Sequence, residues 1–258
     1  MKLMIPFFLA FIFGLSAVMA QKTVGNYTVD TWYTSQTDST VQFKLAQNPN
    51  ENCVMYVMET TLDSLPQKVL VPIADYAQYT SMFMPRMYKS QVLHHTNQSS
   101  LNFVMGKQRK FGVSVSQAET DIVQFSLNLP WLPDNHYTLL LSTFQDPQTE
   151  IIHVYWIQYD EKNYKNISGS WLLEVPSPTT KNFWGSSVFD TKTYPNSNED
   201  IYGSWTLTPL ANNKTFVHYE NYVDPGWMGR QVIDDVVKST LEDMPKIISV
   251  IRTNVPRD

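Results

Sequence analysis

One amphipathic segment near the C-terminus, preceded by a long stretch of strand-like sequence, constrains the fold most. Apolar residues recur there at spacings of three and four, while Asp and Glu lean toward its start and Lys and Arg toward its end. This pattern predicts a single long helix whose charge order suits the helix dipole, with a kink expected at Pro245. The apolar stripe consists of Ile233, Val236, Val237, Thr240, Leu241, Met244, Ile247, Ile248 and Ile251.

The sequence between about residue 90 and residue 225 shows no helix-length periodicity. Short apolar or alternating runs there are separated by polar and proline-containing breaks, which favours an antiparallel meander over 88–158 and further strands after it. Earlier, the alternation of Val41, Phe43 and Leu45 is followed by a turn at 48–52 and an apolar run over 53–61, which predicts a hairpin. A doubly wound βαβ fold is disfavoured because it needs helices between its strands.

Two short helices are expected near 65–80. Pro66 suits an early helical position, Asp63 or Ser64 is the expected cap, and the apolar spacing continues to about residue 80. Pro72 should break or kink the pattern, and we expect one helix near 65–71 and another near 73–80. With one long helix against one antiparallel sheet, the fold class is α+β with two layers.

The first twenty residues have the layout of a secretory signal peptide. Lys2 precedes an apolar run, and Val18-Met19-Ala20 places small residues where cleavage before Gln21 requires them. We expect residues 1–20 to be removed and residues 21–258 to form a single domain, exported to a bacterial periplasm or the cell exterior. The alternative is an uncleaved N-terminal anchor. The single cysteine, Cys53, excludes an intrachain disulfide and is expected to be a small buried hydrophobe.

Composition and motifs argue against several classes of function. The net charge is −5 without a long basic run, which excludes nucleic acid as an expected partner. The five histidines have no two-ligand spacing, and Gly-x-Ser-x-Gly is missing from the sequence, so neither a metal site nor a serine-hydrolase elbow is predicted. We expect no cofactor. The hydrophobic fraction of 43% and aromatic fraction of 13% suffice for a sizeable core.

The C-terminal third resembles a known superfamily. The matching stretches are 203–209 (Gly-Ser-Trp-Thr-Leu-Thr-Pro), 214–219 (Lys-Thr-Phe-Val-His-Tyr) and 223–226 (Val-Asp-Pro-Gly), followed by the long helix that ends in 244–252. Looser matches upstream are 69–79, 84–85, 90–93 and 129–133. These stretches resemble the lipid-binding START superfamily, the helix-grip (SRPBCC) proteins related to steroidogenic acute regulatory protein.

The resemblance implies a curved antiparallel sheet wrapped around the long C-terminal helix, with a hydrophobic ligand beneath that helix. The expected function is an exported, non-enzymatic binding or transfer protein for a lipid or sterol-like molecule. We expect a monomer that makes transient contact with membranes. The residues expected to line the cavity are Met84, Met87, Trp131, Tyr155, Trp171, Trp205, Tyr219, Ile233, Val237 and Leu241.

Three alternatives stay open at this point. Some helix-grip relatives are cyclases or hydrolases, and an enzyme of that kind needs polar groups converging in the cavity, around His218, Glu220, His153 or Tyr159. A lipocalin-like barrel is a second alternative, because Gly203-x-Trp205 echoes the signature of that family. The third is a packed domain whose aromatic residues only fill the core.

Overall fold

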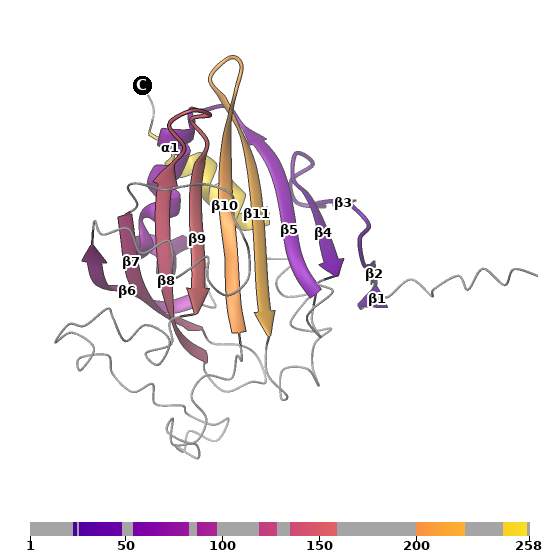
Figure 1. Ribbon diagram of the computed structural model, residues 1–258. Helices are drawn as coiled ribbons and strands as arrows, with labels where there is room; N and C mark the ends of the chain where they lie inside the picture. The colour runs from indigo at the N-terminus through magenta and orange to yellow at the C-terminus, as the bar shows by residue number, and fades with distance from the viewer. Residues whose placement is uncertain are drawn as a thin grey trace, which may run out of the picture.

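The computed structural model describes residues 23–24, 26–47, 54–82, 87–96, 119–127, 135–158, 200–224 and 245–256. Its centre is an antiparallel sheet with the strand order β3-β4-β5-β11-β10-β9-β8-β7-β6 (Figure 1). A separate two-stranded ribbon pairs β1 (Thr23–Val24) with β2 (Tyr27–Thr28). The strands of the large sheet are β3 (Tyr33–Thr34), β4 (Gln42–Gln47), β5 (Val54–Leu62), β6 (Met87–Thr96), β7 (Glu119–Leu127), β8 (Asn135–Gln145), β9 (Ile152–Gln158), β10 (Asp200–Leu210) and β11 (Lys214–Asp224).

The pairing confirms both strand predictions within the described residues. β4 and β5 form the expected hairpin, with Phe43 opposite Met58. Strands β6 to β9 pair in sequence order, as a meander should. Residues 101–105 and 113–115, which fall within the predicted meander, lie outside the described residues. The sheet is completed by β11, which pairs with β10 on one side and with the distant β5 on the other.

The helical region after β5 differs from the sequence prediction in two details. α1 (Pro66–Ala74) begins with Pro66 as expected, but Leu65 occupies the N-cap position without a side-chain cap. Neither expected cap occupies that position: Asp63 pairs with Lys214 at 2.8 Å, and the backbone carbonyl of Ser64 accepts from the Thr215 hydroxyl at 2.6 Å.

Pro72 does not end the helix, so the expected boundary between two helices at this residue was wrong. It lies inside α1, which ends two residues later, and the non-helical backbone comes at Asp75. Pro72 and Ile73 are both buried, so packing offsets the hydrogen bond that the proline ring removes near the end of the helix. The 3₁₀ helix η1 (Tyr76–Gln78) and α2 (Tyr79–Met82) follow.

The C-terminal helix is described over residues 245–254. Residues 228–244, which carry most of the predicted long helix, lie outside the described residues, so its full length stays a prediction. The described part buries Ile247, Ile248 and Ile251 in the main core cluster. It lies on the same side of the sheet as α1 (Figure 1). The fold is thus a mostly antiparallel sheet with a few helices on one face, as the α+β assignment predicted.

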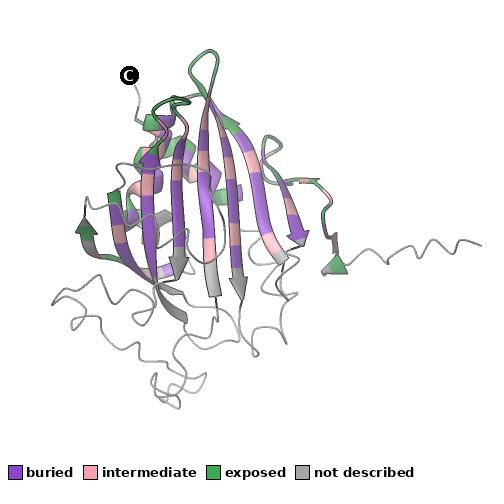
Figure 2. Ribbon diagram, in the orientation of Figure 1, coloured by how far each residue is buried: buried purple, intermediate pink, exposed green. Residues whose placement is uncertain are grey.

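The two faces of the sheet have different composition. We call the face toward α1 and the C-terminal helix the inner face; Met58, Trp205 and Tyr219 belong to it and to the main core cluster. Their neighbours in sequence, Glu59, Thr206 and His218, form the opposite, outer face because successive side chains of a strand alternate. Figure 2 shows that buried positions run along the middle of the strands, whereas the hairpin tips are exposed.

The sheet is open over the described residues. Its edges are β3, which has two residues, and β6, whose pairing with β7 is irregular between Met87 and Lys89 and between Val92 and His94. Short and irregular edge strands discourage pairing with other chains. The lipocalin-like barrel is therefore wrong for these strands. Within the described ranges, no helix combines the length and hydropathy that a membrane span requires.

Candidate functional site

The centre of the inner face is an aromatic cluster contributed by neighbouring strands. Trp205 on β10 and Tyr219 on β11 are register partners, and their ring centroids lie 4.3 Å apart. Trp156 on β9 and Tyr56 on β5 flank them, with centroids 5.6 Å and 6.2 Å from that of Tyr219. All four side chains are at most 8% exposed. The inner face therefore presents a continuous aromatic surface beneath the helices.

Gly203 makes room for one member of this cluster. A Cβ atom at this position would lie 2.4 Å from Cζ2 of Trp156 and 2.3 Å from the Glu220 carbonyl oxygen. The absent side chain lets the indole lie against the β10 backbone and reach β11. There its Nε1 donates to Oδ1 of Asn221 at 3.2 Å. The Trp156 ring is thus fixed in place by packing and by one hydrogen bond.

A second aromatic group lies where η1 and α2 meet the sheet. Tyr76 and Tyr79 form an edge-on pair at 5.4 Å, and Tyr79 stacks on Phe125 of β7 at 5.6 Å. The Tyr79 hydroxyl donates to the Ile73 carbonyl, which links α2 to the end of α1. Through these contacts the short helices pack against the inner face.

Two tyrosine hydroxyls are buried in this core: that of Tyr56 has no hydrogen-bond partner among the described residues, and that of Tyr76 lies near the Thr143 side chain, which acts to lower its pKa. Burial raises the pKa of Tyr56 well above its usual value of 10.0, and the neighbouring Tyr219 and Tyr27 raise it further. Burial also raises the pKa of Tyr76, and Asp121 adds to the increase. Both groups are therefore neutral donors at any physiological pH.

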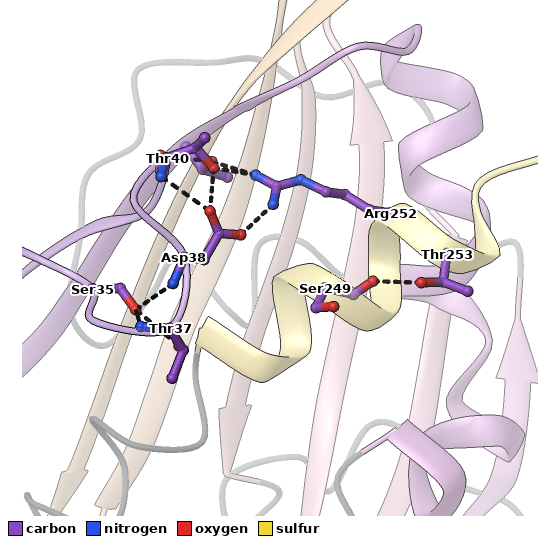
Figure 3. A network of polar contacts seen from close by, with 8 residues as sticks. Ser35, Thr37, Asp38, Thr40, Ser249, Arg252 and Thr253 are labelled. Carbon is purple, nitrogen blue, oxygen red and sulfur yellow. Dashed lines mark hydrogen bonds and ion pairs between the residues drawn. The ribbon is translucent and has the colours of Figure 1, made fainter.

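The C-terminal helix is held over this face by a polar network at its end (Figure 3). The Arg252 guanidinium donates to Asp38 and to the Thr40 hydroxyl, and reaches the Thr60 hydroxyl at 3.3 Å. Burial alone would raise the pKa of Asp38, but the hydrogen bonds from Thr40 and Arg252 and the charge of Arg252 lower it below its usual value. The network joins the helix to the segment before β4 and to β5.

The structure places four of the ten expected cavity residues. Met87, Trp205 and Tyr219 belong to the main core cluster of the inner face. Tyr155 does not: it is register partner of Ser204 and lies on the outer face, because Val154 and Trp156 occupy the inner positions of β9. An inner-face site therefore excludes Tyr155. The other expected residues, Met84, Trp131, Trp171, Ile233, Val237 and Leu241, lie outside the described residues.

The groups named for an enzyme do not converge on the inner face. His218 and Glu220 share the outer face, where Nδ1 of His218 lies 3.0 Å from Oε1 of Glu59 and its Nε2 lies 3.9 Å from Oε2 of Glu220. Glu220 raises the pKa of His218, burial opposes the increase, and Glu59 adds to it.

His153 shares the outer face with His218. Its Nδ1 lies 3.1 Å from the Tyr155 hydroxyl, and burial lowers its pKa, which Asp146 partly opposes. Tyr159 lies outside the described residues. Among the described side chains, no group of three His, Cys, Asp or Glu is arranged to hold a metal ion.

Sequence reasoning missed the polar part of the inner face. Tyr56, Trp156 and Asn221 were not among the expected site residues, although each lies beside or opposite one that was. Two-residue spacing offered a signal: Trp156 follows Val154, and Asn221 follows Tyr219 on the same face of its strand. Cross-strand neighbours such as Tyr56 and Asn221 become visible only once β5 and β11 are paired.

Comparison with known proteins supports the fold. The sequence matches no family model and no curated protein. A STAR-related lipid transfer protein from Xanthomonas axonopodis has a similar structure, with a TM-score of 0.52 at 12% identity over 88% of this chain and 100% of that chain. Human STARD10 gives a TM-score of 0.51 at 10% identity over 87% of this chain and 72% of that chain. The chain therefore has a START/SRPBCC-like fold.

Proposed function

We propose that the chain is an exported protein that binds or transfers a hydrophobic molecule of the lipid or sterol-like class, held between the sheet and the C-terminal helix. The observation that carries the proposal is the aromatic inner face formed by Trp156, Trp205 and Tyr219 beneath a helix that also buries Ile247 and Ile251. The Xanthomonas protein of the same fold is named for lipid transfer.

The chemistry of the inner face suits such a ligand. Binding sites for small hydrophobic molecules are lined mainly by apolar and aromatic side chains, with a few polar groups that fix orientation. The main core cluster consists of aliphatic, methionine and aromatic side chains, and the buried tyrosine hydroxyls supply the polar groups. Met87 adds an adaptable thioether side chain at 5% exposure.

Export is part of the proposal and is supported by the N-terminal sequence alone. The layout of residues 1–20 suits a cleaved signal peptide, which would place the carrier in a periplasm or outside the cell. A monomer in transient contact with membranes would suit exchange of a lipid. N-terminal sequencing of the protein recovered from its native compartment should give a chain beginning at Gln21; a retained Met1 would contradict export by cleavage.

Mass spectrometry of extracts from the purified native protein tests the binding function. We expect a bound hydrophobic compound in roughly stoichiometric amount, and uptake of members of a lipid panel by the delipidated protein. Trp205→Phe should reduce the bound amount because it shrinks the indole surface at the centre of the inner face. Trp32→Phe is the matched control, since Trp32 is 40% exposed. An empty native protein that takes up nothing from the panel would refute the proposal.

A further inference from the structure

The unpaired hydroxyl of Tyr56 is the feature of the inner face that ordinary core packing leaves unexplained. Tyr56 is 4% exposed, and its ring lies between Phe43 and Tyr219 at centroid distances of 6.2 Å from each. Its hydroxyl oxygen is buried and has no hydrogen-bond partner among the described residues. Leaving such a group unpaired disfavours the folded state by about five- to 150-fold. A partner that arrives with the ligand would remove this penalty.

A second donor lies directly opposite. Asn221 is the register partner of Tyr56, and directly opposite residues of paired strands hold their Cβ atoms about 5 Å apart. The Asn221 Oδ1 atom already accepts from Trp156 Nε1, which leaves the side-chain N–H₂ group as the free function of that amide. On the other side Asn221 faces Gly203, over which the Trp156 indole lies. Two neutral donor side chains therefore come from directly opposite positions of the inner face.

The described residues around this spot favour an uncharged partner. Every member of the main core cluster is uncharged, and the phenol of Tyr56 stays protonated. The nearest described guanidinium in the helix layer, that of Arg252, is committed to Asp38 and Thr40. Among the described residues no free cation would meet a carboxylate or phosphate buried here, and burying an uncompensated anion is strongly unfavourable.

We infer that the bound molecule presents an uncharged oxygen acceptor, such as a hydroxyl, ester or ketone, to the Tyr56 hydroxyl and the Asn221 amide. This inference rests on the proposed function and specifies its ligand class. It favours sterols, long-chain alcohols and neutral glycerides over free fatty acids, and over phospholipids bound with the headgroup inward. Tyr56 acts by recognising this oxygen, while the aromatic surface around it contributes the affinity that all hydrophobic ligands share.

The test compares matched probes on the delipidated full chain by native mass spectrometry. Two neutral pairs differ by one oxygen, cholesterol against 5α-cholestane and 1-hexadecanol against hexadecane, and palmitate supplies the anion. The wild type should prefer the oxygenated member of each pair by about five- to tenfold, and should bind palmitate more weakly than the alcohol. Tyr56→Phe should abolish the preference within the neutral pairs and leave binding of the two hydrocarbons unchanged.

Tyr56→Phe should also change the melting temperature of the empty protein, and in the direction opposite to the loss of a structural hydrogen bond. Because Tyr56→Phe removes an unpaired buried hydroxyl, it should raise the melting temperature of the empty protein by about 2–4 °C per kcal/mol recovered. Tyr79→Phe is the matched control: its hydroxyl already donates to Ile73, so this change should lower stability and preserve the preference.

The outcomes separate this inference from the proposed function. If wild type binds both members of each pair equally, or Tyr56→Phe keeps the preference, the inference is overturned and hydrophobic binding stands; the hydroxyl then meets only water. If wild type binds none of the probes, the proposed function fails and the inference fails with it.

Discussion

Substitution of Gly203 by alanine should destabilise the sheet at the point where it supports the aromatic cluster. The added Cβ would lie 2.3 Å from the Glu220 carbonyl oxygen, 2.4 Å from Cζ2 of Trp156 and 2.7 Å from its Cε2. The first contact is with the backbone of the neighbouring strand, so a change of rotamer cannot relieve it. The strands must move apart, and the indole must shift as well.

The expected loss follows from three contributions. Overpacking of this kind costs about 1–3 kcal/mol. Displacing the indole weakens the Trp156–Asn221 hydrogen bond, which contributes about 0.5–1.5 kcal/mol. The smaller conformational freedom of alanine in the unfolded chain offsets about 0.5 kcal/mol. The free energy of unfolding should therefore fall by about 1–4 kcal/mol; the middle value, about 2.5 kcal/mol, lowers the melting temperature of a chain of this size by about 5–10 °C.

Urea unfolding followed by circular dichroism measures this loss, and a second substitution isolates its cause. In a Trp156→Leu background the ring contacts disappear while the contact with the Glu220 carbonyl remains. In the Trp156→Leu background, Gly203→Ala should therefore lower the free energy of unfolding by about 1 kcal/mol less than it does in the wild type. Some loss should remain, because the contact with the backbone carbonyl remains. A cost below about 0.5 kcal/mol in the wild type, or an equal cost in both backgrounds, would refute the explanation of Gly203 by close contact.

Two further changes test the polar contacts. Arg252→Gln should lower the free energy of unfolding by about 0.5–1 kcal/mol at low salt, because it removes a partly exposed ion pair with Asp38. The loss should be smaller in 1 M NaCl, which screens the pair. A loss independent of salt would contradict an electrostatic role. His218→Gln should lower the free energy of unfolding most at acid pH. The pKa of His218 is raised in the folded state, so the protonated ring stabilises the fold. This stabilisation is complete below the unfolded pKa of about 6.5 and disappears as the pH rises through the folded pKa. Urea unfolding of both proteins from pH 5.5 to pH 8.5 measures the difference, and a constant or growing gap would contradict this sign.

Local patterns in the sequence predicted the elements that depend on short spacings. The alternation through Phe43 and Leu45 predicted a hairpin, and the structure has it. Residues 205 and 219 were expected to line one site, and they are register partners. In the hairpin, period-two burial is written into neighbouring residues, so pattern and structure agree, whereas the role of residues 205 and 219 in a site stays a prediction.

Other features depend on contacts that no local pattern encodes. β5 pairs with β11, and this pairing places Tyr56 opposite Asn221. The same pairing lets the Thr215 hydroxyl donate to the backbone carbonyl of Ser64 just before α1, where Leu65 and neither expected cap occupies the N-cap position. Pro72 remains helical because its burial outweighs one lost hydrogen bond. Tertiary packing decides each of these cases.

The central claim is that a hydrophobic molecule binds on the inner face, and residue-level photolabelling tests it most directly. A long-chain alcohol carrying a diazirine, added to the delipidated protein and irradiated, should modify inner-face residues such as Trp156, Trp205 and Tyr219. Excess 1-hexadecanol should suppress this labelling. Labelling that saturates instead at outer-face residues such as Tyr155 and Tyr202, or labelling that no competitor suppresses, would contradict the claim.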